Sequence, residues 1–221
     1  MLPSSTVENY LKALHQAEAS MGNETLVPMG QLANAVGVAP GTATTMVKAL
    51  AESGLVEYEP YVGVRLSSAG TRLATLVLRR HRLIEQFLVE VMGMSWADVH
   101  EDAEQLEHVV SDRLVERMDA MLGHPAVDPH GDPIPTADGA LADPDYHSLL
   151  TCPLSTPVTV TRVTDQNSSF LRFLEAQELK PGQSIEVENR NSAADSVQVL
   201  AGERRVTIGT NAASKVLIEI L

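Results

Sequence analysis

The sequence predicts an α+β protein built from three successive parts, and three observations lead to this prediction. Apolar side chains recur at helical spacing through most of residues 6–122, where strand spacing intervenes only once. Residues 124–145 are dense in Pro, Asp and Gly, which is typical of a linker or an ordered loop. Beyond this stretch the apolar spacing becomes that of strands. We therefore expect domains at residues 1–72, 73–148 and 149–221.

The composition indicates a globular protein and excludes several classes. Of the 221 residues 44% are hydrophobic, which is enough for a packed core. The single cysteine, Cys152, rules out an intrachain disulfide and a thiolate zinc cluster within one chain. The net charge of -13 argues against an indiscriminate nucleic-acid binder, although residues 29–82 are richer in Lys and Arg than in acids. Without a long apolar run or a basic leader, we expect a cytoplasmic protein with no membrane partner.

The first domain is expected to begin with an amphipathic helix over residues 6–21, which Gly22-Asn23 would end. Residues 27–54 predict two further helices with a turn between them. Pro40 suits the first turn of the second of these helices, and Gly54 suits its exit. The spacing matches a helix-turn-helix, although an ordinary helical hairpin would show the same pattern.

Residues 55–67 favour DNA binding, because they predict two short strands around a tight connection, and a helix-turn-helix followed by a hairpin is a winged helix. On this interpretation DNA would meet hydroxyl groups and single cations: Thr42, Thr44, Thr45 and Lys48 on the second helix, and Arg65 on the wing. This helix face is poor in Arg and Asn, the best base readers, so affinity per copy should be modest. A homodimer on a palindromic double-stranded operator would compensate.

The second domain is helix-rich to about residue 122, with more apolar positions than the wing needs for cover, and we assign the surplus to dimerisation. Its segment H-E-D-A-E-Q-L-E-H, residues 100–108, gathers proton-handling and metal-binding side chains. If the segment is helical, one face carries His100, Glu104, Glu107 and His108. His81 and Glu85 form a second i,i+4 pair, so two facing helices could supply imidazole and carboxylate donors to a metal. A solvated acidic stripe is the alternative.

The third domain is expected to be a small β-barrel. Five segments alternate or run apolar, as strands do: 158–163, 184–188, 196–200, 204–208 and 216–220. A short helix at residues 169–177 lies among them.

The quoted segment and several others resemble the diphtheria toxin repressor family of metal-dependent transcription regulators, including its manganese transport regulator branch. The resemblance rests on the N-Y-L opening, the winged helix, R-R-H-R-L-I-E, H-E-D-A-E-Q-L-E-H-V-V-S-D, P-H-G-D-P-I-P and an SH3-like (FeoA-like) C-terminal domain. It covers essentially the whole chain. It implies a metal-loaded homodimer that represses metal-uptake genes, with Mn²⁺ or else Fe²⁺ as cofactor and one or two ions per subunit.

Carried over by position, the resemblance also implies metal ligands. The primary site would hold Glu104, Glu107 and His108, supported by His81, with Asn9 where the manganese branch has an aspartate. Glu8 is expected to face another direction. The ancillary site would hold His81, Glu85 and His100, and in longer relatives further donors come from positions matched here by Asp128, His130, Asp165 and Gln166.

Two other functions fit parts of the sequence. A winged-helix regulator that senses a small organic ligand would make the acidic stripe incidental. A metallohydrolase would use a glutamate as general base beside a bound ion. The sequence, however, contains no HExxH motif, nucleophile elbow or phosphate loop. We therefore expect a metal-activated DNA-binding repressor and no enzymatic activity.

Overall fold

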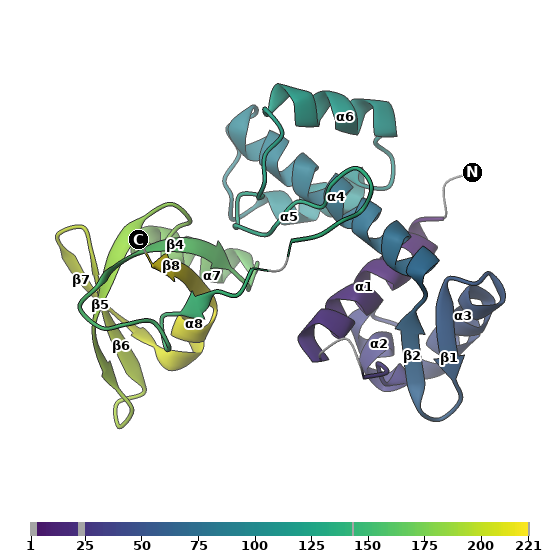
Figure 1. Cartoon of the computed structure of the whole chain (residues 1–221), viewed down its shortest axis with the longest axis horizontal. Helices are drawn as coiled ribbons and strands as arrows, with labels where there is room; N and C mark the ends of the chain where they lie inside the picture. Colours follow the sequence, from purple (N-terminus) through teal and green to yellow (C-terminus); the bar gives the residue numbers. More distant parts are fainter. Residues whose placement is uncertain (1–3, 22–24, 143, 221) are drawn as a thin grey trace. The chain divides into compact units, whose positions relative to one another are not determined.

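The computed structural model describes residues 4–21, 25–142 and 144–220 (Figure 1). The chain forms two compact units. One comprises Met1–His81, Glu107–Val109 and Pro135–Leu141, and the other comprises Arg82–Leu106, Val110–Ile134 and Ala142–Leu221. The predicted end of the first helix, Gly22-Asn23, lies outside the described residues. Within the described ranges no helix is long and apolar enough to cross a membrane.

The first unit holds the winged helix that the sequence predicts. Its helices are α1 (Ser5–Met21), α2 (Met29–Ala35), α3 (Pro40–Glu52) and the part of α4 (Ser68–Glu90) up to His81. Strands β1 (Val56–Glu59) and β2 (Gly63–Leu66) form the antiparallel wing. Leu11, Leu32 and Val47 are each fully buried, and because they come from α1, α2 and α3 their shared core holds the three helices together.

Two glycines allow backbone segments to approach closely at and after the wing. A Cβ atom at Gly63 would lie 2.6 Å from the carbonyl oxygen of Val27, and one at Gly70 would lie 2.0 Å from that of Leu55. Side chains do not tolerate such distances, so only glycine fits at either position. The close approaches fix β2 to residue 27 and the first turn of α4 to residue 55. Strand β2 is therefore held to the segment before α2, and α4 to the residue before β1.

The second unit begins with the rest of α4, which packs with α5 (Val99–Leu106) and α6 (Asp112–Met121). Ile84 of α4, Val99 of α5 and Met118 of α6 share one hydrophobic cluster. The 73–122 segment is thus helical as predicted, and Gly93, with φ of 70°, lies in the predicted break.

Helix α5 ends at Leu106, so the prediction of one helical face through residue 108 is wrong. His100 and Glu104 lie on α5, whereas Glu107 and His108 lie in the turn that follows. Residues 107–109 belong to the first unit, and the helix before them belongs to the second. The spacing of side chains predicts a helix that continues past its real end. The residues that Glu107 and His108 contact are distant in sequence, so a local pattern does not reveal them.

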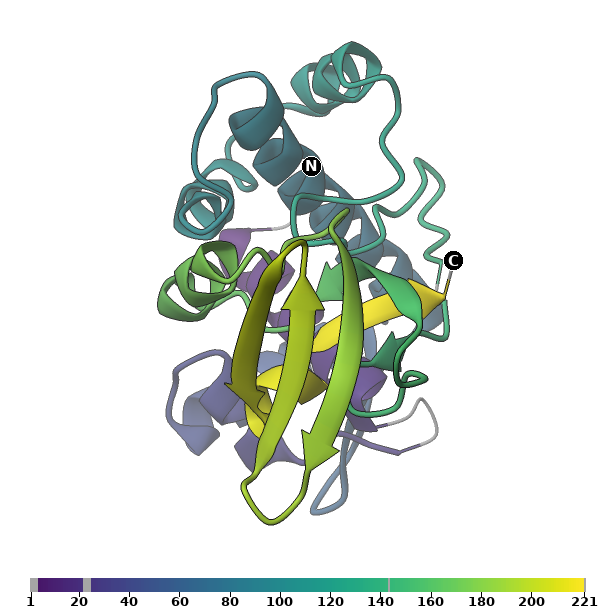
Figure 2. The same cartoon turned by 90° about the vertical axis from the view of Figure 1, so that its left-hand side faces the viewer.

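The C-terminal part of the second unit is an antiparallel sheet in the order β3-β8-β4-β5-β6-β7, and Figure 2 shows β5, β6 and β7 side by side. The elements are β3 (His147–Ser148), β4 (Pro157–Val163), α7 (Ser168–Ala176), β5 (Ser184–Asn191), β6 (Ser196–Ala201), β7 (Arg204–Gly209), α8 (Thr210–Ser214) and β8 (Val216–Ile220). Alternate residues of β6, such as Val197 and Val199, are buried in one core with Leu171 of α7.

The five predicted strands and the helix among them are confirmed, whereas β3 and α8 are too short to show a sequence pattern. Among the described residues β3 and β7 are the edges of the sheet, so the SH3-like domain is an open curved sheet and not a closed barrel. Its core also takes in Trp96 and Ala97, which precede α5. These two residues connect the sheet to the region that carries the metal-ligand candidates of the second unit.

Candidate metal centres and DNA-binding face

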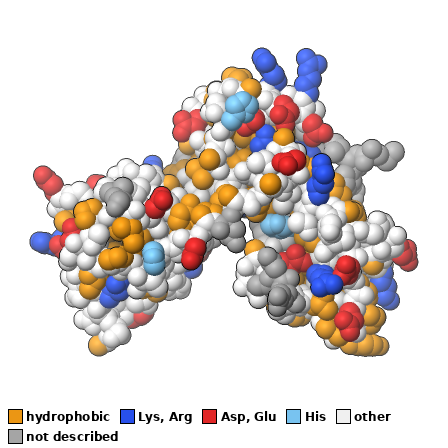
Figure 3. Space-filling model, viewed as in Figure 1, with side chains coloured by type: hydrophobic (Ala, Val, Ile, Leu, Met, Phe, Trp, Pro, Cys, Tyr) orange, Lys and Arg blue, Asp and Glu red, His pale blue; other side chains and the backbone are white. Residues whose placement is uncertain are grey.

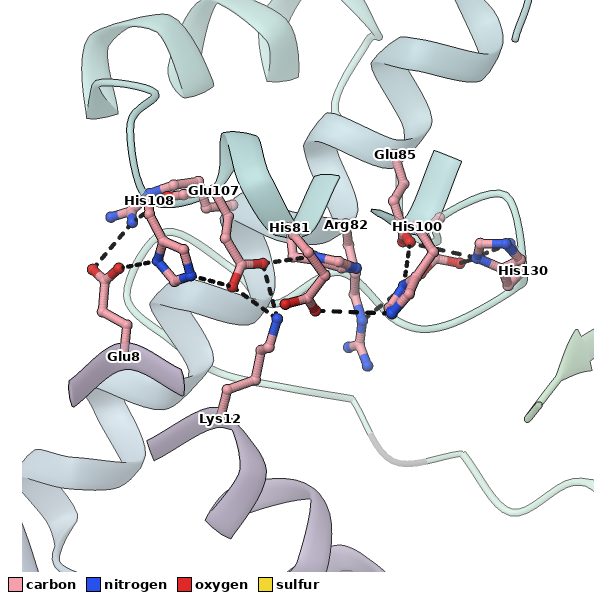
Figure 4. A network of polar contacts seen from close by, with 12 residues as sticks. Glu8, Lys12, His81, Arg82, Glu85, His100, Glu107, His108 and His130 are labelled. Atoms are coloured by element: carbon pink, nitrogen blue, oxygen red, sulfur yellow. Dashed lines mark hydrogen bonds and ion pairs between the residues drawn. The ribbon is translucent and has the colours of Figure 1, made fainter. Parts of the chain in front are cut away.

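A buried group of three potential ligands lies in the second unit. Glu85 comes from α4, and Asp128 and His130 come from the loop after α6 (Figure 4 labels Glu85 and His130). One ligand atom of each lies within 4.8 Å of the others. His130 Nδ1 is 3.8 Å from Glu85 Oε2 and 3.9 Å from Asp128 Oδ1, and all three side chains are completely buried.

The protonation of His130 follows from its second nitrogen. His130 Nε2 is 2.8 Å from the carbonyl oxygen of Trp96, and because a carbonyl only accepts, Nε2 carries the hydrogen. In the neutral imidazole Nδ1 then presents a lone pair toward the oxygens of Glu85 and Asp128. Among the described residues neither His130 Nδ1 nor Asp128 Oδ2 has a hydrogen-bond partner. Lone pairs gathered in this way repel one another unless a cation lies between them, so the group fits a metal ion.

The charge state of Asp128 supports the same conclusion. Burial, followed by the negative charges of Asp132 and Glu85, raises the pKa of Asp128 well above its usual value. Arg82 Nε, 3.8 Å from Asp128 Oδ2, offsets only part of this effect. A bound divalent ion would supply the missing positive charge, which ligand carboxylates require to remain ionised.

The loop that carries Asp128 and His130 is rigidly held. Asp128 Oδ1 accepts hydrogen bonds from the amides of His130 at 2.8 Å and Asp132 at 2.9 Å. The carbonyl of His130 accepts one from Val163 of β4 at 2.8 Å. Gly131 has φ of 85°, and a Cβ there would lie 1.8 Å from a backbone oxygen of β4, so the close approach requires glycine. The donors are thus positioned by the backbone before any ligand binds.

The other predicted donors of this unit are placed differently. His100 Nδ1 lies 3.1 Å from Glu85 Oε1, and its Nε2 lies 3.8 Å from Glu104 Oε1, with both side chains about one-third exposed at 37% and 36%. Asp165 accepts a hydrogen bond from Lys215 at 2.7 Å, and this bond, followed by one from the amide of Asn167, lowers the pKa of Asp165. The described contacts therefore place His100 beside Glu85 and pair Asp165 with a lysine.

Gln166, which the resemblance also implied as a donor, is used to hold the loop. Its Nε2 donates to Asp132 Oδ2 at 2.8 Å, and Arg162 Nε lies 2.5 Å from Asp132 Oδ1. Both contacts act on the loop through Asp132.

A second buried group lies in the first unit, around Glu107 (Figure 4). Glu107 Oε2 is 2.6 Å from His81 Nδ1, and Lys12 Nζ of α1 donates to both carboxylate oxygens at 2.8 and 3.0 Å. Burial alone would raise the pKa of Glu107, but the hydrogen bond from His81 and the charge of Lys12 more than offset it, so the pKa is lowered.

His108 is held on the other side of Glu107. Its Nδ1 is 2.6 Å from Glu8 Oε2, and its Nε2 is 3.5 Å from Glu107 Oε1. Arg80 completes the group, because its guanidinium donates to Glu8 Oε1 at 3.3 Å and to the Glu107 carbonyl at 2.8 Å. The expectation that Glu8 faces another direction is wrong: Glu8 is buried and contacts His108, whereas Asn9 is exposed.

Sequence reasoning missed Lys12 and Arg80 as members of this group, and Lys12 is the more unexpected of the two. A lysine in the middle of an amphipathic helix normally belongs to its solvated face. Glu8 and Lys12, at i and i+4, are nevertheless buried on α1 together with Leu11. A charged i,i+4 pair beside buried leucines is the signal that could have revealed a role for Lys12 inside the protein.

The predicted DNA-binding residues lie on α3 and β2 as expected, and Thr42, Thr45 and Lys48 are exposed. The hydroxyl of Thr44 donates to the carbonyl of Pro40 at 2.8 Å, and that of Thr45 donates to Gly41 at 3.0 Å, which leaves their oxygens available as acceptors. Arg65 is paired with Glu57 at 2.6 Å on the exposed wing. On the face that Figure 3 shows, acidic and basic side chains are interspersed rather than gathered by sign.

Comparisons with known proteins agree with these features. Residues 3–64 match the model of the iron dependent repressor N-terminal DNA binding domain, residues 67–136 that of the metal binding and dimerisation domain, and residues 147–220 the FeoA domain. The iron-dependent repressor IdeR of Mycobacterium leprae (strain TN) is 27% identical over 97% of this chain and 96% of its own length.

Solved structures extend the comparison. A manganese-dependent transcriptional repressor in complex with manganese is 37% identical, with a TM-score of 0.86 over 97% of this chain and all of that chain. The manganese regulator SloR is 30% identical, with a TM-score of 0.75 over the whole of both chains. These proteins are transcriptional regulators and not enzymes. The chain therefore belongs to the iron-dependent repressor family of metal-dependent, DNA-binding transcriptional repressors.

Proposed function

We propose that this protein is a cytoplasmic, homodimeric repressor of metal-uptake genes that Mn²⁺, or else Fe²⁺, activates for operator binding. The observation that carries the proposal is the Glu85–Asp128–His130 group, in which a histidine lone pair and two carboxylates converge in a buried space. His100, 3.1 Å from Glu85, would be the nearest further donor. The metal would supply the positive charge that joins Glu85 of α4 to the loop that carries Asp128 and His130.

The chemistry of the donors supports manganese. Carboxylate oxygen and imidazole nitrogen are hard or borderline ligands, and the group contains no thiolate that would favour softer metals. Affinity alone will not select Mn²⁺, because Fe²⁺ and Zn²⁺ bind more tightly at nearly any such site. We expect the selection to occur in activation, since Zn²⁺ is satisfied by four ligands and Mn²⁺ takes more. The manganese-dependent repressor with which this chain shares 37% identity supports the same choice.

The DNA-binding part of the proposal rests on α3 and the wing. Thr42, Thr44, Thr45 and Lys48 would meet the major groove and its phosphates, with a smaller contribution from Arg65 because Glu57 already neutralises it. We propose residues 1–72 as the DNA-binding domain, 73–148 as the metal-binding and dimerisation domain, and 149–221 as the SH3-like domain.

The metal must also shift the population of the protein toward the form that binds DNA. To convert a population of which 1% can bind DNA into one of which 99% can, the metal must favour the DNA-binding form by roughly 5.5 kcal/mol.

Native mass spectrometry tests the metal part of this proposal directly. We expect a dimer that takes up Mn²⁺ and releases it to a chelator, and we expect His130→Ala to lose this ion. The matched control is His147→Ala, because His147 is an exposed histidine of the same unit. Circular dichroism checks that both variants fold. A folded His130→Ala variant that binds Mn²⁺ as wild type does would contradict the proposed site.

A further inference from the structure

The group around Glu107 is chemically unlike the Glu85–Asp128–His130 group, although the family resemblance implies a metal at Glu107. The ammonium of Lys12 lies on the carboxylate itself, at 2.8 and 3.0 Å from its two oxygens. Glu107 is completely buried and the Lys12 side chain is only 8% exposed. The cation therefore lies inside the group and not at its edge.

Two hydrogen donors, Lys12 and His81, already lie on the Glu107 carboxylate. Glu107 Oε2 has His81 Nδ1 at 2.6 Å in addition to Lys12. His108 Nδ1 lies 2.6 Å from Glu8, and because an ionised carboxylate only accepts, this nitrogen carries a hydrogen, which leaves the lone pair of a neutral His108 on Nε2, 3.5 Å from Glu107 Oε1. In the other group His130 Nδ1 has no hydrogen-bond partner among the described residues.

The charges of the described contacts around Glu107 also balance without a metal. Glu8 and Glu107 contribute two negative charges, and Lys12 and Arg80 contribute two positive ones, with all four side chains buried. A divalent ion added to this group would leave two buried positive charges in excess. Buried charges require partners, so the donor set around Glu107 does not fit a divalent ion while Lys12 is in place.

We propose that the Lys12 ammonium takes the place of a divalent cation at Glu107, so that each subunit binds one activating ion, at Glu85–Asp128–His130. This inference rests on the proposed metal-dependent function. Lys12 would join α1 to the turn at residues 107–109 whether or not metal is present. The charge at position 12 would then decide whether the protein holds one ion or two per subunit.

The test uses the full-length His130→Ala variant, in which the first site is removed, and counts Mn²⁺ ions per subunit by native mass spectrometry. We expect no bound ion in this background while Lys12 is present. Lys12→Gln removes the ammonium, so Glu107, His81 and a reoriented His108 become available, and we expect a gain of one ion per subunit. Adding Glu107→Gln to that variant should remove the gained ion, which would assign it to this group.

Two controls separate the charge of Lys12 from other effects of substitution. Lys12→Arg keeps a cation at the position and should gain no ion. Lys48→Gln makes the same change on the exposed face of α3 and should also gain none. The electron paramagnetic resonance signal of Mn²⁺ provides a second readout, because free hexaaqua Mn²⁺ gives a sharp spectrum that is lost on binding.

The outcomes distinguish this inference from the proposed function. Two ions per wild-type subunit, one lost in His130→Ala and the other in Glu107→Gln, would overturn the inference and leave metal activation intact. A Lys12→Gln variant that folds but gains no ion would also overturn it. No Mn²⁺ binding by the wild-type protein would instead overturn the proposed function.

Discussion

Replacing Lys12 by methionine should strongly destabilise the protein, because it leaves the Glu107 carboxylate buried without its cation. Methionine preserves most of the length of the side chain, so the main loss is the ammonium and its contacts at 2.8 and 3.0 Å. Removing one partner of a buried ion pair costs about 3–5 kcal/mol. The hydrogen bond between His81 and Glu107, at 2.6 Å, remains and places the expected loss near the lower limit, at about 3 kcal/mol.

Lys180 provides the matched control. It pairs with Glu175 at 3.0 Å, nearly the same distance, but the two side chains are 40% and 45% exposed. An exposed pair contributes only about 0–1 kcal/mol, so Lys180→Met should cost little. Its ammonium also lies 5.7 Å from the ring centroid of Trp96, which can only add to the cost of the control. The comparison therefore tests burial rather than distance.

The assay is urea unfolding followed by circular dichroism, with a chelator present so that metal binding does not contribute. The free energy of unfolding is obtained from the midpoint and the slope, and an unchanged slope is needed for the comparison. If Lys12→Met loses no more stability than Lys180→Met, Lys12 does not neutralise a buried Glu107, and the argument for a resident cation fails.

Three further results are expected. The pKa of Glu107 is lowered from its usual value of 4.5, so ionised Glu107 stabilises the fold above pH 4.5. This stabilisation is lost as the pH falls through the lowered pKa. Glu107→Gln should therefore flatten the acid side of a curve of unfolding free energy against pH. Burial raises the pKa of the Cys152 thiol, so iodoacetamide at neutral pH should alkylate Cys152 only after unfolding, which mass spectrometry would show. Lys48→Ala should weaken operator binding and reduce the slope of its salt dependence by about one, whereas Arg65→Ala should have a smaller effect because Glu57 already pairs with Arg65. Fluorescence anisotropy at several salt concentrations measures both effects. Equal effects of the two substitutions would contradict this assignment.

The elements with a clear local pattern could be predicted from the sequence. Strands β4 to β8 show apolar residues at period two. The second helix of the helix-turn-helix begins at Pro40, whose fixed φ suits the first helical turn, and is followed by Gly54, which adopts a positive φ of 72°. The end of α5 at Leu106 could not be predicted, because Glu107 and His108 are turned toward partners some 100 residues earlier in the chain.

The candidate site shows the same division. Residues that could bind metal were found by type and spacing, and Glu85, Asp128 and His130 do converge. Their grouping depends on a rigid loop whose geometry no local pattern reveals. Lys12 and Lys215 decide which carboxylates remain available, since each neutralises an acid far away in the sequence. Which acid each lysine neutralises cannot be known until the fold is known.

The most direct test of metal control at Glu85–Asp128–His130 is operator affinity measured by fluorescence anisotropy, on a duplex selected from a random library with the Mn²⁺-loaded protein. We expect Mn²⁺ at saturation to tighten binding of the wild-type protein by roughly 5–150-fold relative to a chelator, the usual range of allosteric coupling. His130→Ala should lose this response, and His147→Ala should keep it. Equal affinity with Mn²⁺ and with chelator, or a full Mn²⁺ response in folded His130→Ala, would contradict the account.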